Sequence, residues 1–110
     1  MNAGGVDKAC KLDATPLSFC YNISMYYVYI LKSKKDGRMY TGFSMDLRQR
    51  VADHNNGKSS YTKNFRPWKL IYYEAFLSEK DAKQRERNLK IIPNSSTQLR
   101  KRLKNSINET

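Results

Sequence analysis

The sequence predicts one α+β domain, in which a small three-stranded antiparallel sheet is flanked by helices in the order ββαβαα. A chain of 110 residues fits a single compact domain. Three short runs rich in β-branched and aromatic residues are separated by segments with helical spacing of apolar residues. An Asp-Gly pair between the first two runs is typical of a hairpin, so these strands are expected to be antiparallel.

The first two strands are expected at residues 25–31 and 38–43. The first run is too short for a helix and has apolar side chains throughout, so it predicts a strand buried on both faces. The hairpin turn is placed at Asp36-Gly37. If the turn holds an even number of residues and no bulge, Tyr29 and Tyr40 lie on the same face of the sheet.

The second half of the domain is predicted to hold one strand and three helices. Ser44 or Asp46 is expected to cap a helix that ends near Asn55. After Pro67, residues 68–76 predict the third strand.

A longer helix is expected to follow the third strand. Ser78 has an acidic residue three positions later and should cap a helix that runs to about Lys90. Pro93 is expected to end this helix, and Ser95 or Ser96 to cap a last one. The spacing of Leu99, Leu103 and Ile107 by four residues predicts the buried side of that last helix.

The charge of the chain indicates phosphate-rich partners. The net charge is +11, from 21 Lys and Arg against 10 Asp and Glu. Residues 1–24 hold two basic and two acidic side chains, so the excess lies in residues 25–110. Such a field attracts phosphates and nucleic acid.

The first 24 residues have no sustained hydrophobic period and are expected to be a poorly ordered N-terminal extension. Both cysteines lie in it, and no CxxC or HxxxH pair offers a metal cluster. No apolar run approaches the roughly 20 residues of a membrane span, and no positively charged start is followed by an apolar stretch, so a secretory signal is not expected. These observations favour a cytoplasmic protein.

Glu86 is the first candidate functional residue. It lies on the same face of its helix as Ala82 and Leu89, where an ionised carboxylate is costly unless paired. An ion pair with a neighbouring arginine is one interpretation. The other is a ligand for Mg²⁺, which takes one or two carboxylates together with water and substrate phosphate.

Arg50 and His54 lie four residues apart and share a helix face. A surface pair between Asp46 and Arg50, with His54 as a favourable partner of the helix dipole, explains them structurally. Together, however, a guanidinium and an imidazole could bind a phosphate and assist proton transfer. Tyr29 and Tyr40 in their strands could likewise be core residues or part of a site.

The order of these residues resembles the GIY-YIG nuclease superfamily, in particular its short stand-alone bacterial members. Residues 27–29 stand at the first triplet and residues 40–42 at the second, with their tyrosines eleven positions apart. The family's helix arginine, the histidine four residues later and the late glutamate then follow in order. The resemblance covers roughly residues 25–104, and further matches are Thr62, Pro67, Trp68, Leu70, Tyr73 and Glu74.

The resemblance implies a metal-dependent endonuclease domain at residues 25–108 that hydrolyses nucleic acid, DNA in preference to RNA. The resemblance also implies that the domain uses Mg²⁺ or Mn²⁺, and it suggests a role in DNA repair. The catalytic residues it implies are Tyr29, Tyr40, Arg50, His54 and Glu86, with Glu86 as the metal ligand. Tyr27 and Thr41 depart from the family's triplets at structural positions, and Phe43 stands where excision-repair members have a lysine.

The chemistry assigns a role to each group. Arg50 would bind the phosphate oxygens, and Tyr29 or Tyr40 would be the general base. Because a free phenol has a pKa near 10, Arg50, His54 and the metal are expected to lower it. Six basic side chains would follow the phosphate backbone: Lys83, Arg87, Lys90, Arg100, Arg102 and Lys104.

Two alternatives remain open from the sequence. A non-catalytic nucleic-acid-binding module could keep this fold, and Tyr61, Phe65 and Trp68 could stack on unpaired bases or simply pack. A basic protein-interaction domain explains the charge but not the ordered set of site residues. Cleavage of both strands of a duplex by one active site would need a homodimer or a partner protein.

Overall fold

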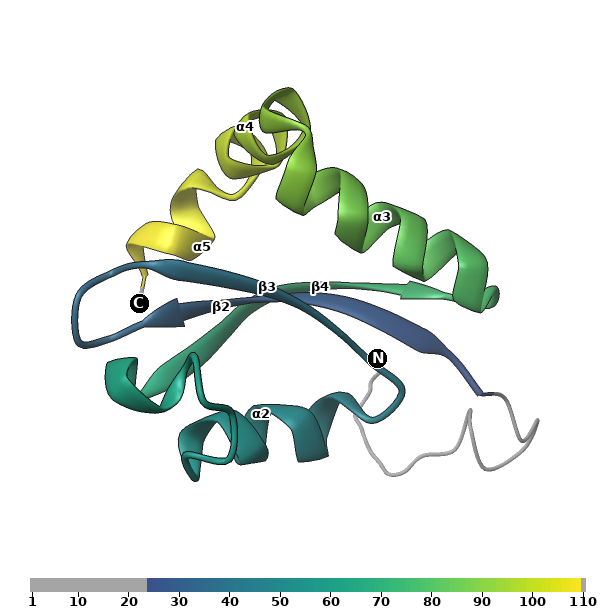
Figure 1. Ribbon diagram of the computed structural model, residues 1–110. Coiled ribbons are helices and arrows are strands. Elements are labelled where there is room, and N and C mark those ends of the chain that lie inside the picture. The colour runs from purple at the N-terminus through teal and green to yellow at the C-terminus, as the bar shows by residue number, and fades with distance from the viewer. Residues whose placement is uncertain (1–23, 110) are drawn as a thin grey trace, which may run out of the picture.

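The computed structural model describes residues 24–109, which form a three-stranded antiparallel sheet with helices on both faces (Figure 1). The strands are β2 (Tyr26–Ser33), β3 (Met39–Ser44) and β4 (Trp68–Phe76), in the order β3-β2-β4. The helices are α2 (Leu47–Asn55), the short 3₁₀ helix η1 (Lys63–Phe65), α3 (Glu79–Ile91), α4 (Pro93–Arg102) and α5 (Lys104–Asn108). The predicted α+β class and ββαβαα order are confirmed. The expected N-terminal extension lies, except for Ser24, outside the described residues.

The hairpin between β2 and β3 decides which side chains share a face. Tyr29 pairs with Gly42 and Leu31 pairs with Tyr40 across the two strands. The Ser33 N–H donates to the Arg38 carbonyl at 2.8 Å, which leaves a four-residue turn between them. Residues paired across antiparallel strands point to the same side, so Tyr29 and Tyr40 share one face, as predicted.

The central strand β2 is covered on both faces. Val28 and Ile30 pack with Ala82, Leu89, Leu99 and Leu103 under α3 and α4. Tyr29, Leu31 and Trp68 form a second cluster on the face that α2 covers. In Figure 1, α2 lies below the sheet and α3, α4 and α5 lie above it. The alternate residues of β2 therefore enter two different cores.

Two of the predicted helix caps are present. The Asp46 carboxylate accepts a hydrogen bond from the Gln49 N–H at 3.2 Å and caps α2. The Ser78 hydroxyl oxygen accepts from the Asp81 N–H at 3.4 Å and caps α3. None of the helices within residues 24–109 is long and apolar enough to cross a membrane.

The last helix differs from the expectation. Neither Ser95 nor Ser96 caps it, because α4 already begins at Pro93. Proline suits the first position of a helix, where its missing N–H needs no partner. The helix is then interrupted at Leu103, whose N–H donates to the carbonyls of Leu99 and Arg100 before α5 begins.

Candidate active site

A buried tyrosine and histidine form the centre of the site. The Tyr29 hydroxyl lies 2.8 Å from His54 Nε2, and both residues have an exposed fraction of 0%. Tyr29 comes from the central strand β2, and His54 from the last turn of α2. Burial, followed by the positive charge of Arg50, lowers the pKa of His54 below its ordinary value. The imidazole is therefore neutral at pH 7, and one ring nitrogen donates while the other accepts.

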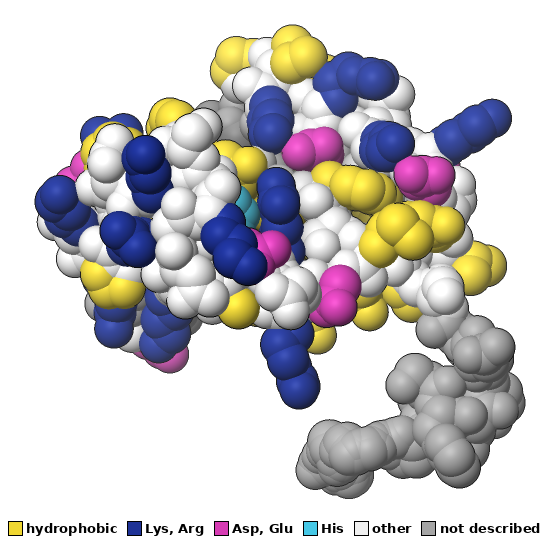
Figure 2. All heavy atoms as spheres, turned by 60° about the horizontal axis from the view of Figure 1, so that its bottom comes forward, with side chains coloured by type: hydrophobic (Ala, Val, Ile, Leu, Met, Phe, Trp, Pro, Cys, Tyr) yellow, Lys and Arg dark blue, Asp and Glu magenta, His cyan; other side chains and the backbone are white. Residues whose placement is uncertain are grey.

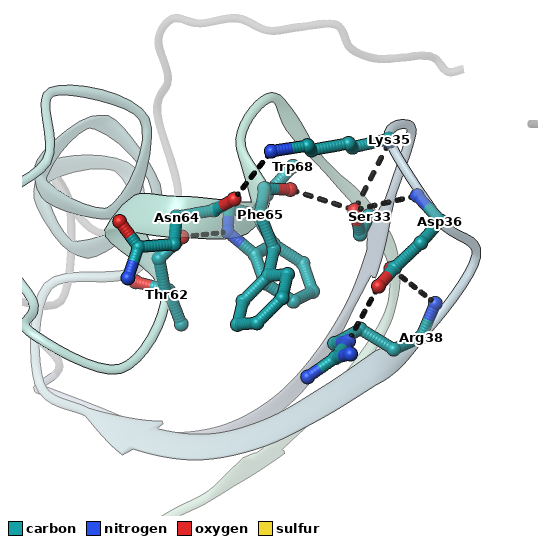
Figure 3. Close-up of polar contacts among 8 residues, drawn as sticks. All are labelled: Ser33, Lys35, Asp36, Arg38, Thr62, Asn64, Phe65 and Trp68. Atoms are coloured by element: carbon teal, nitrogen blue, oxygen red, sulfur yellow. Dashed lines mark hydrogen bonds and ion pairs between the residues drawn. The ribbon is translucent and has the colours of Figure 1, made fainter.

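Thr62 completes a chain of three buried polar side chains. His54 Nδ1 lies 2.8 Å from Thr62 Oγ1, and Thr62 is fully buried. The Thr62 carbonyl accepts from Trp68 Nε1 at 2.9 Å, a bond drawn in Figure 3. In the sequence Thr62 is only one hydroxyl in the polar segment before β4. Its contact with His54 depends on how that segment folds back over α2.

Tyr40 joins this chain from β3. Its ring centroid lies 4.9 Å from that of His54 in an edge-on arrangement, and 6.3 Å from that of Tyr29. The ring centroids of Tyr40 and Trp68 are also 6.3 Å apart. Unlike Tyr29, Tyr40 is only partly buried. The two tyrosines predicted from the motif therefore differ in their access to solvent.

Gly42 makes room for the Tyr29 ring. A Cβ atom at this position would lie 2.4 Å from the Tyr29 hydroxyl oxygen and 2.5 Å from its Cζ. These distances are far below a van der Waals contact, so any other residue would push the ring away. The glycine of the second triplet therefore allows Tyr29 to lie across β3 and reach His54.

Arg50 lies beside the Tyr29 hydroxyl. Burial raises the pKa of Tyr29 to about 12, and Arg50 counteracts this only in part. Arg50 lowers the pKa of Tyr29, as expected, but burial raises it by more, and a neutral His54 adds no positive charge. The surface ion pair between Asp46 and Arg50, the structural interpretation from the sequence, is not what these side chains form. Asp46 caps α2, and the main partner of the Arg50 guanidinium is Tyr29.

Glu86 reaches the same region from α3. Its side chain is 23% exposed, and its Oε2 lies 3.0 Å from Lys90 Nζ. The ion-pair partner of Glu86 is thus a lysine and not the arginine of the first interpretation, because Arg85 binds Glu74, with Nη2 and Oε2 2.9 Å apart. Lys90 Nζ also lies 5.7 Å from the Tyr40 ring centroid. The negative charge of Glu86 contributes to the raised pKa of Tyr29.

The structure thus brings together the five residues predicted for the site, which are Tyr29, Tyr40, Arg50, His54 and Glu86. Residues 25–100 match the GIY-YIG catalytic domain. The chain belongs to the GIY-YIG family. The resemblance drawn from the motifs is confirmed, and it places the chain in a family of nucleases.

Short bacterial proteins are similar to this GIY-YIG chain. The UPF0213 protein of Staphylococcus saprophyticus is 44% identical over 66 residues, which are 59% of this chain and 79% of that protein. The UPF0213 protein of Clostridium perfringens is 45% identical over 67 residues, 60% of this chain and 71% of the relative. The solution NMR structure of a UPF0213 protein from Bacillus halodurans is 36% identical, with a TM-score of 0.44 over 68% of this chain and 81% of that chain.

The donor set of this GIY-YIG domain fits one type of metal binding. Among residues 24–109, no group of three or more His, Cys, Asp or Glu side chains could hold a metal ion. Glu86 is a single carboxylate, and the side chain of its partner Lys90 is 45% exposed and can move away. A single carboxylate suits Mg²⁺ or Mn²⁺ that keeps most of its waters and also binds substrate phosphate.

The six cations predicted to bind nucleic acid are all exposed on α3, α4 and α5. Two of them form ion pairs with a glutamate one helical turn away, Lys83 with Glu79 at 3.1 Å and Lys90 with Glu86 at 3.0 Å. Figure 2 turns the α2 side of the molecule forward and shows Lys and Arg side chains widely spread over it. The positive charge therefore covers more than one face.

Proposed function

We propose that this chain is a metal-dependent endonuclease that hydrolyses phosphodiester bonds of DNA. The buried chain from Tyr29, which lies beside Arg50, through His54 to Thr62 carries the proposal. Three polar groups in a core cost stability compared with apolar side chains unless each is hydrogen-bonded. An arrangement that satisfies both nitrogens of a neutral histidine is what a proton-transfer site requires.

The proton path follows from the chemistry of neutral histidine. Thr62 Oγ1 accepts from Nδ1–H, so that Nε2 is free to accept from the Tyr29 hydroxyl. Substrate that binds at the exposed Arg50 would bring an attacking water to the buried hydroxyl. The hydroxyl oxygen then takes a proton from this water, and its own proton passes to Nε2. Because the proton is relayed, Tyr29 acts as the general base without becoming a free phenolate, which its pKa of about 12 would prevent.

Arg50 and Glu86 complete the proposed mechanism. The exposed guanidinium of Arg50 binds the non-bridging oxygens of the phosphate as their negative charge grows. Glu86 would hold one Mg²⁺ or Mn²⁺, which when bound supplies Lewis-acid stabilisation of the phosphate and the leaving oxygen. The exposed cations of α3, α4 and α5 follow the backbone without reading sequence. Double-strand cleavage would use a homodimer or a partner protein.

The test is cleavage of labelled branched, single-stranded and duplex DNA and RNA with Mg²⁺, Mn²⁺ or EDTA. We expect cleavage of DNA with either metal and none with EDTA. Tyr29→Phe should abolish cleavage, whereas Tyr73→Phe, a change at an exposed tyrosine of β4, should not. Thermal denaturation of both variants checks that they fold.

Tight binding without cleavage under every condition would contradict the proposal. The chain would then be the alternative, a binding module that retains the nuclease fold. Cleavage of RNA but not DNA would contradict the substrate class alone.

A further inference from the structure

A strip of aromatic rings and one arginine leads away from the catalytic cluster. Tyr61 has an exposed fraction of 54%. Its ring centroid lies 6.0 Å from that of Phe65, and Arg38 Cζ lies 3.6 Å from the centroid of the Phe65 ring. None of these three residues takes part in the proposed proton path or metal site. We call Arg38, Tyr61 and Phe65 the aromatic strip.

The hairpin holds the backbone at Asn64 and Phe65 in place (Figure 3). The Ser33 hydroxyl donates to the Phe65 carbonyl at 2.6 Å, and Lys35 Nζ donates to the Asn64 carbonyl at 3.1 Å. Arg38 is itself fixed by an ion pair with Asp36, with Nε and Oδ2 2.8 Å apart. Rings that are ordered before a ligand arrives bind it at a lower entropic cost.

The strip is continuous with the catalytic cluster through Tyr40. The ring centroids of Tyr40 and Tyr61 are 5.9 Å apart, and those of Tyr40 and His54 are 4.9 Å apart. A nucleic-acid strand with one phosphate at Arg50 would therefore have its neighbouring nucleotides close to Tyr61. This placement rests on the proposed function.

We propose that the aromatic strip is a stacking platform for unpaired bases beside the scissile phosphate. A ring on the protein can stack only on a base whose face is free, and paired bases inside a duplex have no free face. The preferred substrate is therefore single-stranded DNA or a junction with a splayed strand. Arg38 adds a positive charge next to the stacked bases.

The experiment measures binding in EDTA, where cleavage is blocked. Fluorescence anisotropy is recorded with three labelled DNA ligands of equal length, which are a single strand, an abasic single strand and a duplex. The wild type should bind the single strand about 5- to 150-fold more tightly than the abasic strand. Tyr61→Leu should remove most of this preference and change abasic and duplex binding less than about twofold.

Three controls separate stacking from folding and charge. Tyr61→Phe and Tyr61→Trp keep an aromatic face and should keep the preference. Tyr73→Leu alters another tyrosine that is half-exposed and lies on β4, and it should leave the preference unchanged. Thermal midpoints confirm that all variants fold.

Two results would overturn the platform. One is a wild type that binds base-bearing and abasic strands equally, and the other is a Tyr61→Leu variant that weakens all three ligands alike. Failure of the nuclease proposal has a different outcome. A chain that shows the stacking preference but never cleaves would keep the platform and lose the catalytic function.

Discussion

Gly42→Ala should disable the site by displacing Tyr29. The added Cβ would lie 2.4 Å from the Tyr29 hydroxyl oxygen, whereas ordinary contacts begin at 3.4 Å. The ring or the strand must therefore move by about 1 Å, the difference between these two distances. Tyr29 is fully buried, and its hydroxyl is held at 2.8 Å from His54, so a movement of this size breaks the hydrogen bond.

The free energy of unfolding should fall by about 2–4 kcal/mol. Overpacking a core costs about 1–3 kcal/mol, and loss of one hydrogen bond adds about 1 kcal/mol. For a domain of this size each kcal/mol lowers the thermal midpoint by about 4–8 °C, so we expect a fall of about 10–30 °C. Denaturation followed by circular dichroism measures the change, and cleavage should be lost in the same variant.

A double-mutant cycle tests the cause. In a Tyr29→Leu background the ring is absent. Adding Gly42→Ala to this variant should therefore lower the free energy of unfolding by less than about 1 kcal/mol. Equal costs of Gly42→Ala in both backgrounds, or a wild-type midpoint after the single change, would refute the steric argument.

Four further predictions concern the site and its charge. Glu86→Gln should abolish cleavage and keep nucleic-acid binding. Because the partner Lys90 is exposed, the thermal midpoint should change little. A large fall in stability with cleavage intact would contradict the metal role. Thr62→Val should cost about 1–3 kcal/mol in urea denaturation by leaving His54 Nδ1 unpaired, and Thr62→Ser should cost clearly less. The pKa of His54 is lowered in the folded protein. Its contribution to stability is therefore complete above the ordinary histidine pKa of 6.5 and is lost as the pH falls through the pKa of the folded state. Between pH 7.5 and 5.5 the thermal midpoint should fall more in the wild type than in His54→Asn. Duplex binding should follow log salt with a slope of roughly −4 to −5 if about five phosphates are neutralised, and a slope near zero would contradict nucleic-acid binding.

The local elements were predictable because their signals are local. Strand β2 follows from an apolar run, the hairpin from Asp36-Gly37, and the caps of α2 and α3 from Asp46 and Ser78. The last helix was mispredicted because Pro93 can either end one helix or begin the next. The choice depends on how α4 packs over the sheet through Leu99, which its own neighbours in the sequence do not reveal.

By itself the sequence determined the fold class, the family motifs and the shared face of Tyr29 and Tyr40, because spacing along a strand or helix decides which side chains lie together. Only the tertiary structure decided what surrounds each of them. Thr62 contacts His54 because a loop folds back over α2. Glu86 forms an ion pair with Lys90, since Arg85 is bound to Glu74. The high pKa of Tyr29 is likewise a tertiary property, because desolvation depends on every group packed around the ring and not on the neighbours in sequence.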